Sequence, residues 1–280
     1  MRLKVWGCRG SVPTPGAGTV RYGGNTSCVE VALDDESVLV LDAGTGIRCL
    51  GDDLVKRGVL RFHLLLTHLH LDHLEGLRFF APLWDERFSI DIWGPPSPVS
   101  NLRERISRSF SPPLFPRELR DVPCSVAFHD VPWEPWSVDV ATLTAGLVVH
   151  PGPTVGYRIE AGDASFAYLP DHEPALAGAI AGRSKDWLSG GPITDGVDML
   201  LHDAQYSEEE YRHRMGWGHS SVADAVAYAK AVEAQRRLLF RHEPLHNDGS
   251  LDVLEDRARE LAGSNGLRPT LAREGMVVEL

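Results

Sequence analysis

The chain has 280 residues, of which 43% are hydrophobic and 24% are charged, and its formal net charge at pH 7 is -11. This composition supports one large core, and no linker-like stretch separates two halves, so we expect a single domain over residues 1–280. The acidic balance disfavours a general nucleic-acid-binding surface, because phosphate backbones are held largely by Lys and Arg, but it leaves open a small phosphate ester. No apolar run approaches the ~20 residues of a membrane span, and none of the signal-peptide type follows Met1.

The four cysteines give a prediction about the compartment. Cys8, Cys28, Cys49 and Cys124 show no paired spacing of the zinc-ribbon or redox type. They are most simply free thiols in a reducing cytosol, so we expect a cytoplasmic protein without membrane contact.

The N-terminal part of the chain predicts three strands and a helix. The first strand covers residues 3–7, residues 27–33 and 37–41 predict a hairpin, and residues 47–55 carry helical spacing. Asp42 lies at the turn between the hairpin and this helix, where aspartate is favoured as an N-cap.

Four residues of metal-ligand type follow the next predicted strand. The apolar residues 62–67 predict a buried strand, and His68, His70, Asp72 and His73 come directly after it, at the start of a predicted helix. In α/β folds, ligand sites gather at such carboxyl ends of strands. Imidazole and carboxylate groups suit zinc, iron or manganese, and two metals ~3.5–4 Å apart need two groups of ligands. The alternative is a histidine-rich surface loop that binds nothing.

The segment that follows, residues 78–135, has the least regular pattern. Residues 103–110 suggest a helix, and the proline-rich residues 111–116 cannot lie in a helix interior. Two hypotheses stay open for this segment. It is either a cap or substrate loop over a site, or aromatic packing at a sheet edge, which is the simpler reading.

The second half of the chain, like the first, predicts several strands together with helices. Strands are predicted over residues 141–149, 156–160, 164–169 and 199–202, and helices over residues 221–237 and 250–261. Ser221 and Asp224 form a capping-box pattern at the start of the first of these helices. Two halves of similar pattern suit two sheets with helices outside them.

The six residues at 68–73 resemble the signature of the metallo-β-lactamase fold superfamily, whose members are αββα sandwiches with a metal pair between two mixed sheets. The resemblance runs in order along nearly the whole chain and implies a four-layer α/β fold for this protein. It also implies two groups of ligands: His68, His70 and His150 for the first metal, and Asp72, His73 and His242 for the second, with Asp171 bridging both.

The resemblance implies two divalent ions as cofactors. Zinc is the first expectation, and manganese or iron also suit mixed histidine and carboxylate ligands. A water between the ions, its pKa lowered to about 7, would be the hydroxide nucleophile, and Asp72 would help to orient it. Asp42 resembles the family's aspartate beside the histidine cluster, a role that is compatible with N-capping.

A loop near residue 219 resembles the ribonuclease Z and phosphodiesterase branch of the superfamily. His219 resembles the histidine that contacts the scissile phosphate and protonates the leaving group. Asp203 resembles its acidic partner, although the branch carries Glu there. The structural alternative is that His219 caps a helix or orders the loop. Together with the acidic charge, the resemblance predicts a metal-dependent phosphodiesterase that cleaves a small ester, such as a cyclic or short nucleotide.

Two other functions stay open. The same metal pair could hydrolyse a lactone, thioester or β-lactam, a reaction with no evident need of His219. A non-catalytic binding module is the remote alternative, although such modules usually lose ligands. We do not expect long nucleic acid as a partner, because the chain has no long basic, glycine-rich arm. Relatives commonly pair, so a homodimer is an option.

Overall fold

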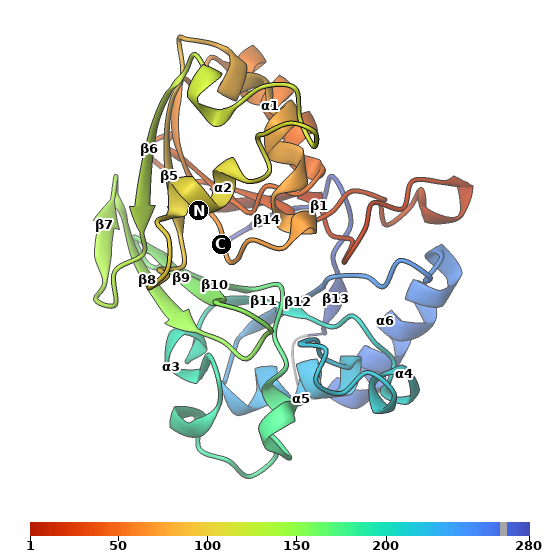
Figure 1. Ribbon diagram of the computed structural model, residues 1–280. Helices are drawn as coiled ribbons and strands as arrows, with labels where there is room; N and C mark the ends of the chain where they lie inside the picture. The colour runs from red at the N-terminus through yellow and green to blue at the C-terminus, as the bar shows by residue number, and fades with distance from the viewer. Residues whose placement is uncertain (264–267) are drawn as a thin grey trace.

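Two seven-stranded β-sheets form the frame of the protein, which a computed structural model describes for residues 1–263 and 268–280. Figure 1 shows the sheets between two groups of helices. From edge to edge, the first sheet contains β14 (Val277–Glu279), β1 (Arg2–Gly7), β2 (Cys28–Ala32), β3 (Val38–Leu41), β4 (Arg61–Leu65), β5 (Ser89–Gly94) and β6 (Ser125–Asp130). The second contains β13 (Thr270–Leu271), β12 (Arg236–Phe240), β11 (Met199–Asp203), β10 (Ala164–Leu169), β9 (Val155–Ala161), β8 (Ala141–Leu147) and β7 (Trp136–Val138).

Each sheet combines antiparallel and parallel pairing in the same way. In the first sheet, the strands from β14 to β3 pair antiparallel and those from β3 to β6 pair parallel. In the second, the strands from β7 to β10 pair antiparallel and those from β10 to β13 pair parallel. The parallel strands of each sheet therefore end at a common edge, where α/β folds place their ligands.

An apolar core lies between the two sheets. Side chains along a strand point alternately to its two faces, so every second residue can enter this core. Both sheets contribute side chains that are at most 1% exposed, among them Leu3, Val31, Leu39, Ile159, Phe166 and Leu201. Burying one such side chain stabilises the fold by ~1.5–3 kcal/mol.

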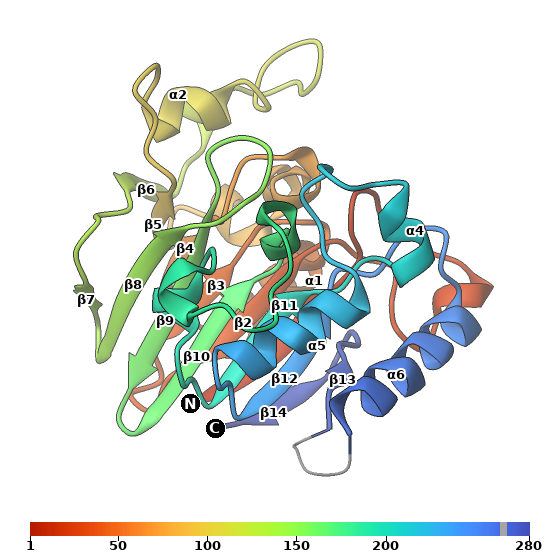
Figure 2. The same cartoon turned by 90° about the horizontal axis from the view of Figure 1, so that it is seen from below.

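Helices cover the outer face of each sheet. α1 (Gly46–Arg57) packs on the first sheet, whereas α3 (Gly191–Thr194), α5 (Val222–Ala231) and α6 (Asp248–Ala262) lie against the second (Figures 1 and 2). α5 has Ser221 as its N-cap, which accepts a hydrogen bond from the backbone N–H of Asp224. The order of helix, sheet, sheet and helix confirms the predicted αββα sandwich.

The longest described helix, α6, has 15 residues. None of the helices within the described residues combines the length and the apolar character needed to cross a membrane.

Two local predictions differ from the structure. The cluster at residues 68–73 does not open an α-helix, because only Leu71–His73 form a single 3-10 turn. The helix predicted over residues 221–237 ends at Ala231, since Glu233 adopts a positive φ of 58° and β12 begins at Arg236.

Residues 78–135 form both a sheet edge and a projecting segment. They supply β5 and β6, and between these strands the chain forms the short helix α2 (Leu102–Ser107). Figure 2 shows α2 and the chain around it standing away from the two sheets. One further short helix, α4 (Glu208–Arg212), follows β11 and begins with a capping box between Ser207 and Glu210.

Candidate metal centre

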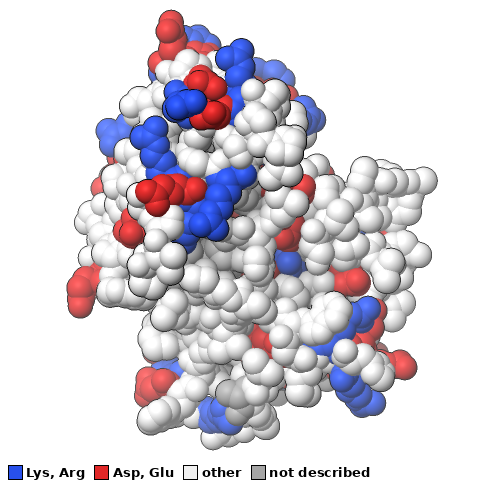
Figure 3. All heavy atoms as spheres, viewed as in Figure 1, with Lys and Arg blue, Asp and Glu red and all other residues white. Residues whose placement is uncertain are grey.

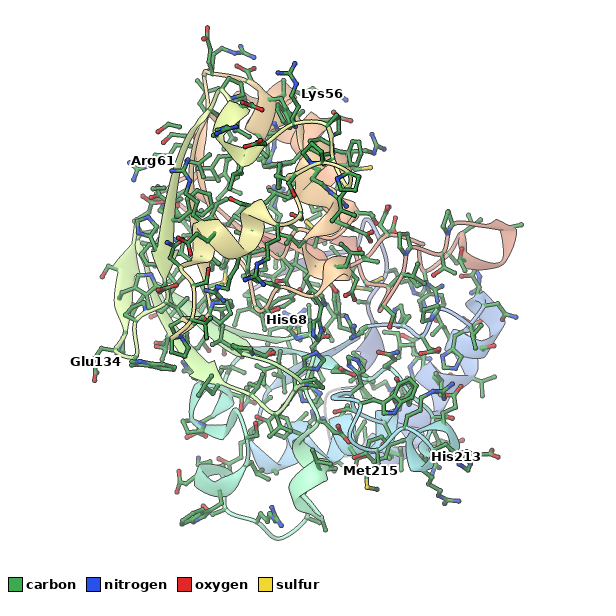
Figure 4. The ribbon with its side chains drawn as sticks, in the orientation of Figure 1. Lys56, Arg61, His68, Glu134, His213 and Met215 are labelled. Atoms are coloured by element: carbon green, nitrogen blue, oxygen red, sulfur yellow. The ribbon has the colours of Figure 1, made fainter. Side chains whose placement is uncertain are left out.

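Side chains of metal-ligand type meet where strands of both sheets end. β4 leads into His68, His70 and His73, whereas His150 follows β8 and Asp171 follows β10. Figure 4 labels His68 near the middle of the molecule, between its two halves. Among residues 1–263 and 268–280, three groups have ligand atoms within 4.8 Å of one another: His68, His70 and His150; His68, His73 and Asp171; and His150, Asp171 and His219.

The spacing of the first group suits one metal ion. His150 Nε2 lies 3.1 Å from His70 Nδ1, and Asp171 Oδ2 lies 3.6 Å from both His68 Nε2 and His150 Nε2. Nitrogen and oxygen ligands at ~2.0–2.1 Å from a tetrahedral zinc lie roughly 3.3 Å apart. His68 Nε2 and Asp171 Oδ2 are buried and make no hydrogen bond within the described residues. Such atoms cost about 1–3 kcal/mol each when unsatisfied, and a divalent ion would satisfy both.

Hydrogen bonds hold two of the histidines with a nitrogen free for a metal. His68 Nδ1 lies 3.1 Å from the Thr67 hydroxyl, and His150 Nδ1 donates to the Gly218 carbonyl at 2.8 Å. With Nδ1 as the donor in each ring, the lone pair of Nε2 is left for coordination. Burial lowers the pKa of His150 to about 4, so its imidazole is neutral at pH 7, as a metal ligand must be.

Asp42 contacts the cluster through Thr67 and His73. Its carboxylate is fully buried and accepts hydrogen bonds from the Thr67 backbone N–H at 2.8 Å and from the Tyr168 hydroxyl at 3.0 Å. It also lies 2.8 Å from His73 Nδ1, which fixes the orientation of that ring. The N-cap of α1 is Thr45, so Asp42 has the supporting role and not the alternative N-cap role.

His219 and Asp203 form a buried pair beside the ligands. His219 Nδ1 lies 2.7 Å from Asp203 Oδ2, and the His219 ring lies 5.1 Å from that of His150. Asp203, at the end of β11, also accepts the backbone N–H groups of Gln205 and Ser220 at 3.0 and 3.1 Å. Burial raises the pKa of the Asp203 carboxyl, and the His219 imidazole opposes that shift. Because Nδ1 is engaged, Nε2 is the nitrogen of His219 that remains for a substrate.

Arg241 fills the position expected for the second metal ion. This residue follows β12 and is 2% exposed. Its Nη1 lies 2.7 Å from His73 Nε2, 2.8 Å from Asp72 Oδ2 and 2.9 Å from Asp171 Oδ1. The first metal site therefore fits these residues, whereas a second ion on the same ligands does not.

His242 does not lie among the ligands, which corrects the expectation that it joins Asp72 and His73. Its Nε2 donates to the Ala272 carbonyl at 2.7 Å, and its ring meets that of Tyr22 edge-on at 5.6 Å. Asp72 is likewise engaged, since its Oδ2 accepts both the Arg241 guanidinium and the Ser11 backbone N–H, at 2.8 Å each. Its expected role in orienting a nucleophile stays a prediction.

Comparison with known proteins assigns the family. A family model described as a β-lactamase superfamily domain matches residues 40–242. The chain belongs to this superfamily. Among its relatives, ribonuclease Z of Haloarcula marismortui is 26% identical over 318 aligned residues, covering 99% of this chain and 96% of the relative. The metallo-β-lactamase fold protein YhfI from Bacillus subtilis has a TM-score of 0.69 at 18% identity, covering 99% of this chain and 98% of that one. A diphosphatase of the PhnP family has a TM-score of 0.67 at 17% identity, covering 100% of this chain and 97% of that one.

Two buried charged residues at the site, Glu173 and Arg241, escaped the sequence analysis. Glu173 is fully buried and accepts the backbone N–H groups of Gly216 and Gly218 at 2.7 Å each, so it anchors the loop that carries His219. Its position two residues after Asp171 was the available signal. The signal for Arg241 was a charged residue directly after a buried strand.

A cavity of about 480 Å³ opens beside the candidate metal centre. Its wall includes His68 and His70 on one side and Arg105, Arg108 and Leu114 from the 78–135 segment on the other. Figure 3 shows basic side chains gathered over α2. Arg105 lies in this helix, and Arg108 directly follows it. Arg108 therefore brings a positive charge to the cavity wall, whereas Arg105 lies 3.5 Å from Asp130 and donates to the Pro95 carbonyl at 2.6 Å.

Proposed function

We propose that the protein is a metal-dependent phosphodiesterase that cleaves a small phosphodiester, such as a cyclic or short nucleotide. The observation that carries this proposal is the His219–Asp203 pair, 2.7 Å apart, beside a ligand cluster that fits a divalent ion. Hydrolysis at phosphorus expels an oxygen that needs a proton, and in this proposal the pair supplies it. The relative named ribonuclease Z and the structural neighbour described as a diphosphatase support chemistry at phosphorus.

In this proposal His68, His70, His150 and Asp171 hold the ion. Zinc suits this ligand set best, and manganese or iron are alternatives. The ion supplies Lewis acidity and, by lowering the pKa of water, a nucleophile at neutral pH.

The remaining groups bind and move a proton. His219 Nε2 donates its proton to the leaving oxygen, while Asp203 holds Nδ1–H and stabilises the positive charge on the ring. Glu173 keeps the loop of His219 in place through its backbone hydrogen bonds. A lactone, thioester or β-lactam hydrolase would not require this pair.

We further propose that residues 78–135 contribute the substrate loop. The cavity volume of about 480 Å³ is in the range of small-molecule sites. Arg108 would meet the negative charge of the substrate, and Leu71 and Leu114 would meet its apolar part. The formal net charge of -11 argues against a long RNA, whose many phosphates need an extended basic surface.

The test is a substrate panel on the metal-loaded protein. We expect turnover of bis(p-nitrophenyl) phosphate and of a cyclic nucleotide, and a fall in kcat of about 10²–10⁴-fold for His219→Ala. His213→Ala is the matched control, because this histidine lies nearby in sequence but is exposed, as Figure 4 shows. Turnover of a lactone or β-lactam without either ester would contradict the proposal, and turnover of a precursor RNA alone would contradict its small substrate.

A further inference from the structure

The second half of the ligand cluster already contains a cation that belongs to the chain. We propose that the Arg241 guanidinium permanently replaces the second metal ion, so that the centre binds one divalent ion per chain. The inference rests on the metal centre of the proposed function, but not on its substrate.

The geometry leaves no room for both cations. Nη1 of Arg241 lies 2.7–2.9 Å from the nitrogen of His73 and from one oxygen each of Asp72 and Asp171. A second ion would need the same three atoms at ~2.0–2.2 Å. It would then lie far inside van der Waals contact with the guanidinium nitrogen.

The chemistry also fits a substitution of one cation by the other. Asp72 and Asp171 are buried carboxylates, and buried charges must be paired or bound to a metal. A guanidinium is always protonated in proteins and donates hydrogen bonds only. Arg241 therefore supplies to both carboxylates the positive charge that a second ion would have supplied, and it does not exchange with solvent.

Several neighbours hold the guanidinium in this position. Nε donates to Gln205 Oε1 at 3.2 Å, and the Gln205 amide in turn donates to Glu243 Oε2 at 2.5 Å. Gly10 lines the side chain closely, because a Cβ there would lie 2.8 Å from Arg241 Cγ. The Arg241 backbone has a φ of 64°, a conformation that a non-glycine residue adopts only when its surroundings enforce it. These contacts together hold the Arg241 side chain in one position.

The exit of the chain from β12 explains why the arginine, and not the adjacent histidine, enters the cluster. The backbone N–H of His242 donates to the Cys8 carbonyl, and the His242 carbonyl accepts from Gly10, each at 2.9–3.0 Å. These two bonds hold the residue after Arg241 against the N-terminal segment. The His242 ring consequently faces Ala272 and Tyr22.

The test measures zinc stoichiometry and does not depend on a substrate. Full-length protein is stripped of metal, loaded with excess zinc, desalted, and analysed by native mass spectrometry and elemental analysis. We expect one zinc per chain for the wild type and for Arg241→Lys, which keeps the charge. We expect two for Arg241→His, because this change removes the fixed charge and offers a ligand nitrogen to Asp72, His73 and Asp171.

The neighbouring residue provides the control. His242→Gln should keep one zinc, because the ring lies outside the cluster. Two zincs on the wild type, loss of a zinc in His242→Gln, or a single zinc on Arg241→His that retains its native circular dichroism would each overturn the inference. A wild-type chain that takes up no zinc would contradict the metal centre of the proposed function itself, and is thus distinguishable from the other outcomes.

Discussion

The two sides of the ligand cluster differ in what fills them. On the side of His68, Nε2 of this histidine and Asp171 Oδ2 are buried without a hydrogen bond within the described residues. On the side of His73, the Arg241 guanidinium contacts the corresponding atoms at 2.7–2.9 Å. Both sides begin from the same six residues after β4, so the difference comes from the facing sheet, where His150 follows β8 and Arg241 follows β12. A ligand motif on one sheet therefore determines only half of each metal site, and the residue that faces it decides whether an ion can bind.

Asp171 is shared by both sides, so replacing it should have the largest effect. In Asp171→Asn, the buried charge between His68 and Arg241 is removed. We expect zinc affinity to fall by about 10²–10⁴-fold, since removing one partner of a buried charge pair costs roughly 3–5 kcal/mol. Isothermal titration with zinc measures this change. The exposed Asp163→Asn is the control, and an affinity for Asp171→Asn equal to that control would show that Asp171 is no ligand.

Replacing Asp203 tests whether the His219–Asp203 pair can be weakened without loss of bound zinc. Asp203→Asn leaves the ligand cluster intact but weakens the bond that holds His219 Nδ1 at 2.7 Å. We expect kcat to fall by about 10²–10³-fold, with zinc stoichiometry and KM nearly unchanged, because the loss concerns proton transfer. Steady-state kinetics on bis(p-nitrophenyl) phosphate provide the measurement. Loss of bound zinc in this variant would instead assign Asp203 a role in holding the metal.

Asp42 supports His73 on the arginine side and, through Thr67, His68 on the metal side. Asp42→Asn should therefore reduce zinc affinity by about 10–100-fold, as is usual when the partner of a ligating histidine is changed. Zinc titration again provides the measurement, with the exposed Asp52→Asn of α1 as the control. An unchanged zinc affinity would mean that Asp42 does not orient the ligating histidines.

Gly10 lies against the Arg241 side chain. In Gly10→Ala, the added Cβ would lie 2.8 Å from Arg241 Cγ, so the guanidinium or its neighbours must shift. We expect a loss of unfolding free energy of roughly 1–3 kcal/mol, the usual cost of overpacking, measured by urea denaturation. Gly16→Ala is the matched control, because a Cβ at that position meets no atom within 4 Å. Equal stability of the two variants would show that Arg241 is not tightly packed.

The fold was predictable from the sequence because strands and turns alternate in it regularly. The hairpin predicted over residues 27–41 is present, with Val29 opposite Leu41 in antiparallel register. The capping residues of α5 were also visible, since Ser221 and Asp224 act within four residues of each other. A helix was also expected over residues 103–110, where α2 forms at Leu102–Ser107. The way residues 78–135 stand away from the sheets was not predictable, because it depends on long-range packing.

The ligand cluster shows where such predictions stop. His68 and His73 follow a buried strand within eight residues, so local sequence indicates where they lie. Local sequence does not indicate whether Arg241 or His242 enters the ligand cluster. Neighbouring residues at the end of a strand face opposite sides, and a positive φ at one of them changes which of the two enters a site.

The order of residues along the chain was enough to predict the layered architecture and the histidine-rich turn, whereas the role of His219 as an acid follows from the family resemblance and stays a prediction. Only the tertiary structure decided that an arginine from the last long strand completes the cluster. That decision depends on how β12 leaves the second sheet and meets the N-terminal segment, which are contacts between residues more than 200 positions apart.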